Sequence, residues 1–471
     1  MAVHYIKDPV HHLIKIFDDD KKILDTCCFQ RLRNIFHLGT GYLTYPGATH
    51  SRFEHSLGVM SLGTSVLYNV INNAMEDEDR LVFWNNFEDK ELKELKNTLR
   101  YACLLHDIGH APFSHVCEEF YEAERDSLVK DLKNQLEFVL DGKENTEQIL
   151  RSKPLHELMS CSIILSHYSN ILETLKVNPK NVCAIILGRV CKDIPIVKRS
   201  HYKVLSNILN SSIDVDKFDY LLRDNYMTGA SLASLDKERL LTSYTVSDKN
   251  NLVLSEKGLC LVTNLIVGRN QVYMWVYQHH KVIFTDTLLR KIISALIDER
   301  LIKVEDFFSK SSVTEGLIDD YDIISEIRKN AKKSKKISYL YSLWREHKFL
   351  KPCWKHAFEF NKKIEGEAKN DLKEDARNKH YKLEKWLAGQ LKIEECRVMV
   401  SYAKFEPFNL SAGRDIPIDV SGSIKYAIGD FGLNIEDIGK YSNVPYIYVD
   451  GDHINDCLSC LKDYSSSYIS D

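Results

Sequence analysis

The sequence has no apolar run of about 18 residues and no N-terminal signal segment, which argues against a membrane-spanning or secreted protein. Its net charge is only −4, so a protein that coats nucleic acid through bulk positive charge is excluded. The twelve cysteines are scattered and form no disulfide framework, and we expect reduced thiols in the cytoplasm. No internal repeat is present. The 471 residues suffice for one large core and a smaller lobe.

What the sequence does contain is a histidine-rich stretch at residues 102–115. The helix expected before it extends to Gly109, because apolar residues recur at helical spacing at Leu92, Leu95, Leu99 and Cys103. His106 then faces inward, with Asp107 beside it and His110 four residues further on the same face. An imidazole and a carboxylate placed in this way can converge on one metal ion, although further ligands must come from elsewhere in the chain.

Two other segments are suited to supply those ligands. Residues 45–58 contain a Pro-Gly turn that leads into an amphipathic helix, with a histidine and an arginine at the helix start, where backbone N–H groups also attract anions. In residues 213–224, Asp216, Tyr220 and Asp224 fall at i, i+4 and i+8 and form a polar stripe on a predicted helix.

The ordered segments resemble the HD-domain superfamily and, within it, the deoxynucleoside triphosphate triphosphohydrolases, meaning the bacterial dGTPase-like enzymes and the catalytic core of the animal sterile-alpha-motif and HD-domain enzyme. The resemblance runs from about residue 4 to about residue 300 and is carried by Asp8-Pro9-Val10-His11, Phe29-Gln30-Arg31-Leu32-Arg33, Pro46-Gly47-Ala48, Ser51-Arg52-Phe53-Glu54-His55-Ser56-Leu57-Gly58, His106-Asp107 and Asp214-Val215-Asp216-Lys217-Phe218-Asp219-Tyr220.

The resemblance implies a metal site and a reaction. The four metal ligands would be His55, His106, Asp107 and Asp216. This set accepts Mn, Fe, Mg, Co or Zn, and a second Mg²⁺ on the substrate phosphates is a further option. The reaction would convert a deoxynucleoside triphosphate (dNTP) and water into a deoxynucleoside and tripolyphosphate.

The resemblance also implies roles for the residues around the metal. The catalytic group comprises His110, His115, Glu118 and His156, with His115 as the candidate general acid and Glu118 as the residue that orients it. Arg52, Lys217 and Tyr220 would hold the phosphates. The remaining substrate residues, which would meet the base, the sugar or the γ-phosphate end, are His37, Leu38, Asp224, Arg269, Tyr277 and His279.

Regulation by a nucleotide between subunits is a further implication of the resemblance. Asp25, Gln30 and Arg33 stand where the animal enzyme reads a guanine effector, so the expected partners are the dNTP substrate, a dNTP or GTP activator and further copies of the chain, as a dimer or tetramer. Nucleic acid and membranes are not indicated as partners.

Each of these elements also has a purely structural interpretation. A His-Asp dipeptide in a helix is often a satisfied polar pair, and Arg52 can salt-bridge Glu54. The stripe of Asp216, Tyr220 and Asp224 can be a solvated face, and His156 can be a core or capping residue. Two alternative functions also stay open. One is an HD phosphodiesterase or nuclease acting on single strands or cyclic nucleotides, and the other is a nucleotide-sensing component of an antiviral system.

The pattern along the chain predicts a mainly α-helical protein. An HD-domain helical core is expected over residues 1–300, followed by a charged helical segment over 301–395. From Cys396 the pattern alternates with period two, so residues 396–471 are predicted to form a small α+β lobe with a short antiparallel sheet.

Overall fold

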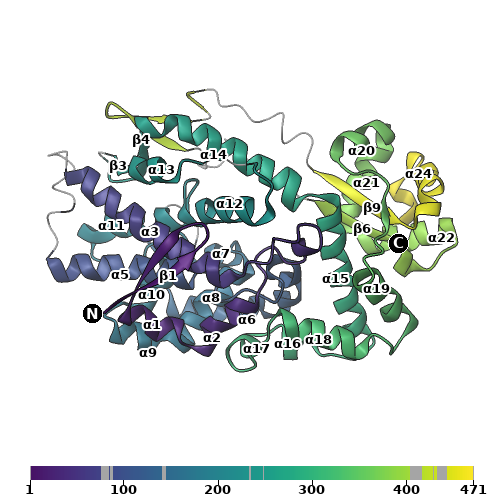
Figure 1. The fold of residues 1–471 in the computed structure, drawn as a ribbon, viewed down its shortest axis with the longest axis horizontal. Helices are drawn as coiled ribbons and strands as arrows, with labels where there is room; N and C mark the ends of the chain where they lie inside the picture. Colours follow the sequence, from purple (N-terminus) through teal and green to yellow (C-terminus); the bar gives the residue numbers. More distant parts are fainter. Residues whose placement is uncertain are drawn as a thin grey trace.

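The computed structural model describes residues 2–75, 84, 88–139, 145–232, 235–247, 249–403, 416–427, 429–431 and 443–469. It confirms a mainly α-helical fold with short sheets. In Figure 1 the purple-to-teal helices fill the left and centre, and most of the green and yellow elements lie at the right and along the lower edge, apart from a yellow-green strand pair beside β4. No described helix is both long and apolar enough to cross a membrane.

Three helices carry the segments in which the metal ligands are predicted. They are α3 (Arg52–Met75), α5 (Asp89–Leu105) and α12 (Val215–Thr228), and α3 packs against both of the others. The packing follows from the expected apolar spacing, because Leu62, Val66 and Val70 of α3 are all buried. Asp214 caps α12 by accepting a hydrogen bond from the backbone N–H of Lys217.

The predicted helix before the His-Asp pair ends at Leu105, four residues earlier than expected. The reason is a clamp from α8 (Leu155–Ile163): Ser160 Oγ donates to the His106 carbonyl at 2.6 Å and accepts from the Gly109 N–H at 2.9 Å. A Cβ at Gly109 would lie 2.3 Å from the Ser160 nitrogen, so only glycine allows this approach. Residues 106–109 therefore form a tight turn, which carries His106 and Asp107 beyond the helix end.

The N-terminus forms a hairpin that the sequence analysis did not anticipate. Strand β1 (Val3–Asp8) pairs antiparallel with β2 (His12–Phe17), in a register that joins Val3 to Phe17 and Asp8 to His12. Arg100 of α5 anchors the strand end, because its Nη2 donates to the Lys15 carbonyl at 2.8 Å.

The strands of the second half of the chain divide between two sheets. β5 (Lys351–Pro352), β9 (Val444–Val449) and β6 (Met399–Ala403) form an antiparallel sheet, in the order β5-β9-β6. β7 (Pro417–Val420) and β8 (Ser423–Tyr426) instead extend the hairpin of β3 (Tyr244–Val246) and β4 (Leu252–Ser255), with β4 and β7 parallel. Figure 1 shows β4 far from β6 and β9.

Helix α15 (His280–Asp298) links the elements before it to those after it, because it contacts the 3-10 segment η3 (Ser114–Glu124) as well as α19 and β6. The remaining described α-helices before α15 are α1 (Asp18–Leu24), α2 (Cys27–Gln30), α6 (Arg125–Gln135), α7 (Thr146–Arg151), α9 (Ser169–Thr174), α10 (Pro179–Ile186), α11 (Ile196–Leu209), α13 (Lys237–Ser243) and α14 (Leu259–Val272). Those after α15 are α16 (Val304–Phe307), α17 (Lys310–Thr314), α18 (Asp320–Asn330), α19 (Lys335–Arg345), α20 (Ala357–Lys363), α21 (Gly366–Asn378), α22 (His380–Leu391) and α24 (Ile454–Lys462).

Candidate active site

A cavity of about 640 Å³ lies between α12, the turn after α5, α8 and the end of α14. Most of the residues for which the sequence predicts a functional role line it: His37, Leu38, Arg52, Asp107, His110, His115, His156, Asp216, Lys217, Tyr220, Asp224, Arg269 and Tyr277. The fold thus brings segments from the first 280 residues to one place, as the predicted chemistry requires.

The four predicted metal ligands meet at the back of this cavity. His55 Nε2 lies 3.0 Å from Asp216 Oδ1 and 3.5 Å from Asp107 Oδ2. His106 Nε2 lies 3.3 Å from Asp107 Oδ1 and 3.7 Å from Asp216 Oδ1. Both imidazoles thus direct Nε2 toward both carboxylates, which is the arrangement that two nitrogens and two oxygens need to share one ion.

The outer nitrogens of the two imidazoles are held by fixed partners. His55 Nδ1 donates to Asp219 Oδ2 at 2.8 Å, and His106 Nδ1 donates to the Cys103 carbonyl at 2.8 Å. Asp219 is itself held by Arg223, whose Nε donates to Oδ2 at 2.8 Å, and by His11 Nε2 at 2.5 Å. These hydrogen bonds place the proton on Nδ1 and leave Nε2 free to bind a metal.

The donor set fits a divalent metal. Within the part of the chain that the structure describes, the Nε2 atoms of His55 and His106 are buried without a hydrogen-bond partner. Two buried, partnerless nitrogens facing two carboxylates are costly in a protein interior unless an ion lies between them. A Cβ at Gly58 would lie 1.9 Å from Asp219 Oδ1, so this glycine is needed for the supporting carboxylate to reach His55.

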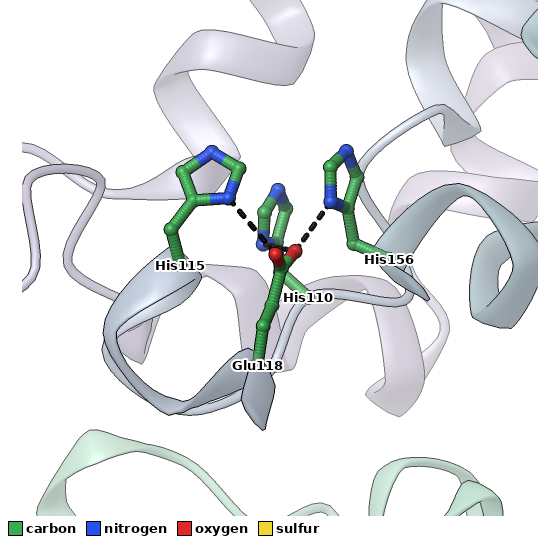
Figure 2. A group of neighbouring side chains, drawn as sticks. All are labelled: His110, His115, Glu118 and His156. Atoms are coloured by element: carbon green, nitrogen blue, oxygen red, sulfur yellow. Dashed lines mark hydrogen bonds and ion pairs between the residues drawn. The ribbon is translucent and has the colours of Figure 1, made fainter. Parts of the chain in front are cut away.

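The four predicted catalytic residues form a second cluster, shown in Figure 2. Glu118, in the 3-10 segment η3 (Ser114–Glu124), contacts His156 Nδ1 through Oε1 and lies 3.3 Å from His115 Nδ1 through Oε2. The rings of His110 and His156 stack, with centroids 4.3 Å apart. His115 is exposed and His110 is buried, so the cluster extends from the protein interior to solvent.

Charge and burial separate the pKa values within this cluster. Burial by itself raises the pKa of Glu118, but the neighbouring imidazoles outweigh it and hold this pKa well below its usual value. Burial by itself lowers the pKa of His156, but Glu118 outweighs it and raises this pKa to about 9. Burial, aided by the Arg52 guanidinium, lowers the pKa of His110 well below its usual value. A cationic and a neutral imidazole therefore stack against each other, with one carboxylate beside both.

The predicted phosphate-binding residues have protein partners here. Arg52 Nη1 donates to Asp107 Oδ2 at 2.7 Å, so the alternative pairing with Glu54 is wrong. Lys217 contacts Asp214 and donates from Nζ to the Ser211 carbonyl at 2.9 Å. The Arg269 guanidinium lies over the Tyr273 ring, 4.5 Å from its centroid. Arg52, Lys217 and Arg269 all line the cavity, so three cationic side chains surround the space in front of the metal-ligand set.

The predicted sugar-contacting residues meet around Asp224. Asp224 accepts hydrogen bonds from Tyr277 Oη and, at 2.8 Å, from His50 Nε2, and it is fully buried, so the polar stripe of α12 is not a solvated face. His37 Nε2 lies 3.7 Å from Asp224 Oδ1, and the His37 ring lies 4.4 Å from the His55 ring. Burial lowers the pKa of His37 well below its usual value, so this imidazole is neutral.

Besides His55, His106 and Glu118, which lie behind the lining residues, four predicted residues do not line the cavity. His279 caps α15 by accepting from the Lys281 N–H at 3.3 Å. Among the effector candidates, Arg33 Nε donates to Gln30 Oε1 at 2.7 Å and lies over the Phe53 ring, whereas Asp25 lines a separate hollow beside α1. These candidates lie in or next to helices α1 and α2, which Figure 1 places toward the lower left of the molecule. The structure does not join them to the catalytic groups.

The sequence analysis missed several supporting residues. Asp219 follows Asp216 by three positions, so helical spacing could have revealed it. Asp320 in α18 could not be found in this way, because its two partners lie more than 200 residues away in the sequence. Its Oδ2 accepts a hydrogen bond from the Phe36 N–H at 2.7 Å, and its Oδ1 accepts one from the Phe113 N–H at 2.5 Å. These two N–H groups belong to the loops that carry His37 and His115. Burial raises the pKa of Asp320 to about 8, although the two N–H donors act in the opposite direction.

Two family models match consecutive parts of the chain. The HD domain matches residues 52–224, and the HD associated region matches residues 235–415. The first match begins at Arg52 and ends at Asp224, and it contains all four residues at the back of the cavity. The first match ends within α12, and the second begins two residues before α13.

Individual relatives agree with these matches. An uncharacterised protein of Methanocaldococcus jannaschii is 29% identical over 329 residues, which are 69% of this chain and 54% of that protein. The deoxynucleoside triphosphate triphosphohydrolase SAMHD1 of Gallus gallus is 30% identical over 306 residues, 64% of this chain and 45% of that protein. The chain thus spans about half the length of both.

Among solved structures, a phosphohydrolase from Bacteroides thetaiotaomicron has a TM-score of 0.65 at 21% identity, and the match covers 95% of this chain and all of the other. At this level of identity the likeness concerns the fold, and it extends well beyond the HD domain into the C-terminal half.

Proposed function

We propose that this chain, whose residues 52–224 match the HD domain, is a metal-dependent phosphohydrolase and, more narrowly, that it converts a dNTP and water into a deoxynucleoside and tripolyphosphate. The observation that carries the proposal is the convergence of two imidazole Nε2 atoms and two carboxylates at the back of a cavity whose front is lined by cationic side chains. The triphosphohydrolases among the relatives support the choice of a dNTP as substrate.

His55, His106, Asp107 and Asp216 would hold the metal. A divalent ion in this position lowers the pKa of bound water and neutralises charge on a phosphoryl group. Asp219 and the Cys103 carbonyl keep the two imidazoles in the ligating tautomer. Asp107 has a second role, because its contact with Arg52 ties the metal-ligand set to the phosphate-binding residues.

The triphosphate lies along the cationic side of the cavity. Arg52, Lys217 and Arg269 neutralise its charge, and Tyr220 donates a hydrogen bond from its hydroxyl. Arg52 is already paired with Asp107, and Lys217 with Asp214. Their present ion pairs hold the two side chains at the cavity wall, which reduces the entropy lost on binding.

His115 donates the proton that the 5′-oxygen needs in order to leave as a hydroxyl group. Glu118 orients the His115 ring through Nδ1, so that Nε2 faces away from the carboxylate. His110 and His156 contact the α-phosphate, and the cationic state of His156 suits an anionic ligand.

His37, Leu38, Asp224 and Tyr277 receive the sugar, with Asp224 as its hydrogen-bond acceptor. The base is assigned to His279, whose ring centroid lies 5.9 Å from that of Tyr45. For regulation we propose that Asp25, Gln30 and Arg33 bind an activating nucleotide in a homo-oligomer.

The test is to incubate the purified protein with each dNTP, singly and in pairs, with Mn²⁺ or Mg²⁺, and to separate the products by ion-exchange chromatography. Deoxynucleoside and tripolyphosphate are expected in equal amounts, and Asp107→Ala should produce neither. Turnover only in mixtures would identify an activator. Cleavage of single-stranded DNA or of a cyclic nucleotide, with no dNTP turnover, would overturn the proposal in favour of a phosphodiesterase.

A further inference from the structure

We propose that His110, His115, Glu118 and His156 form a second transition-metal site, separate from the HD ligands, that binds Zn²⁺ or a similar ion and blocks the active site. The ion-binding part of this inference is independent of the proposed substrate. Only the blocking effect rests on the proposed function.

The geometry of the cluster supplies four ligand atoms that face one another. In Figure 2 all three imidazoles direct a nitrogen toward the Glu118 carboxylate. His115 Nδ1 lies 3.3 Å from Oε2, His110 Nδ1 lies 3.7 Å from Oε1, and His156 Nδ1 contacts Oε1. One ligand atom from each residue lies within 4.8 Å of the other three. Ligands that share a tetrahedral ion at about 2.1 Å are about 3.4 Å apart, so only small rotations separate this cluster from a metal site.

Burial gives an independent indication of a ligand. Within the described residues, both ring nitrogens of His110 are buried without a hydrogen-bond partner, and the side chain is 1% exposed. Asp107 Oδ1 lies 3.3 Å from Nε2 and Glu118 Oε1 lies 3.7 Å from Nδ1, so ion pairing compensates this burial only in part, and an ion on Nδ1 would supply a direct partner. The neighbouring His115 side chain is 62% exposed, so an ion can reach the cluster from solvent.

The ligand types determine which ion is bound. Three imidazoles and one carboxylate suit a borderline ion such as Zn²⁺ or Co²⁺ and disfavour Mg²⁺, which prefers oxygen ligands and retains its water. The ion would replace the proton that His156 shares with Glu118, so binding releases protons. Because the HD set contains two oxygens and only two nitrogens, the two sites differ in their preference among ions.

The two sites share no ligand but are linked through His110. Its Nδ1 faces Glu118, and its Nε2 lies 3.3 Å from Asp107 Oδ1. An ion on the second site would engage His115 Nδ1 and the carboxylate that orients this residue, which removes the proposed proton donor. Zn²⁺ above one equivalent is therefore expected to inhibit a protein whose HD site is already loaded.

The experiment counts ions on the full chain. Protein stripped with a chelator is equilibrated with Zn²⁺ and, in parallel, with Co²⁺, and bound metal is measured by mass spectrometry and by the visible spectrum of Co²⁺. The wild type is expected to bind two ions per chain. Asp216→Ala, which removes an HD ligand that does not contact the cluster, should bind one, and the double variant His115→Ala/His156→Ala should also bind one.

Two further variants keep the result interpretable. His167→Ala removes an exposed histidine that lies outside the cavity, and it should retain two ions. His115→Ala removes an exposed side chain whose loss leaves the core intact. It should lower the affinity for the second ion by at least about tenfold, since loss of even an outer-shell partner lowers metal affinity about 10–100-fold. One ion per wild-type chain, or two ions in the double variant, would overturn the inference. Neither outcome depends on dNTP turnover, so a failure of the proposed function would be recognised separately.

Discussion

The two histidine clusters of this cavity contain similar residues but differ in how their rings are held. In the HD set each Nδ1 is fixed from outside, by Asp219 or by the Cys103 carbonyl, and the Nε2 atoms converge. In the Glu118 cluster the Nδ1 atoms themselves converge, and one carboxylate serves three rings. The first arrangement fixes the tautomer for metal binding. The second leaves all three Nδ1 atoms facing one carboxylate.

The comparison shows that the residue types alone do not assign a role to a histidine. What distinguishes the clusters is the next layer of contacts: Arg223 and His11 hold Asp219 in the interior, whereas Glu118 lies in a 3-10 segment that reaches solvent at His115. The predictions below separate the clusters by removing one contact at a time.

The largest effect is expected for Asp107→Ala. This residue faces both HD imidazoles and Arg52, so its loss removes a metal ligand and leaves a buried guanidinium without its carboxylate. Turnover should fall to background, and the HD ion should be lost. Initial rates and metal content are the measurements. Normal metal content with full activity would show that the ion is held elsewhere.

His115→Asn should lower kcat by about 10²–10⁴-fold, which is the usual contribution of a general acid. The HD ion should remain, because His115 does not contact its ligands. The pH dependence of kcat and the metal content are measured together, with His167→Asn as the control. If the HD ion is lost as well, the two clusters are not functionally separate.

Asp219→Asn should lower the affinity of the HD site for its ion by about 10–100-fold while leaving the Glu118 cluster unchanged. The reason is that an outer-shell carboxylate orients the imidazole ligand and raises the basicity of that imidazole. The matched control is Asp126→Asn, whose side chain is 83% exposed. Calorimetric titration with Mn²⁺ measures the affinity. An unchanged affinity would mean that Asp219 serves only the stability of the fold.

Asp320→Ala should affect the Glu118 cluster and the segment that carries His37 at once. Each buried N–H left without an acceptor costs about 1–3 kcal/mol, and this variant leaves two such groups, those of Phe36 and Phe113, without their acceptor. The free energy of unfolding, measured with denaturant, and kcat are both expected to decrease. Asp306→Ala, at an exposed position of α16, is a suitable control. Loss of stability with unchanged kcat would restrict Asp320 to a structural role.

The last prediction concerns the pH dependence of the free energy of unfolding. Asp320 has a pKa of about 8 in the folded protein and an ordinary value near 3.8 when unfolded. Between these values the folded state binds more protons than the unfolded state, so this group lowers the free energy of unfolding as the pH rises from about 4 to about 8. The decrease should be shallower in Asp320→Asn. Equal pH slopes for the two proteins would contradict the assignment.

The sequence was sufficient to predict the helical class and the segments that meet at the cavity, because those segments are short, ordered and spaced for helices. The pairing of β7 with β4 was not predictable, since period-two alternation reveals a strand but not its partner. Asp320 was missed for a related reason: its contacts depend on the tertiary approach of α18 to two distant loops. The domain boundaries, the residue roles and the effector site stay predictions.

The central claim is that the HD set activates water for attack on the phosphorus next to the sugar. The most direct measurement is dNTP turnover in ¹⁸O-labelled water, with the label located by mass spectrometry. The account predicts one ¹⁸O in the tripolyphosphate and none in the deoxynucleoside. Label in orthophosphate or pyrophosphate, or in the deoxynucleoside, would contradict it.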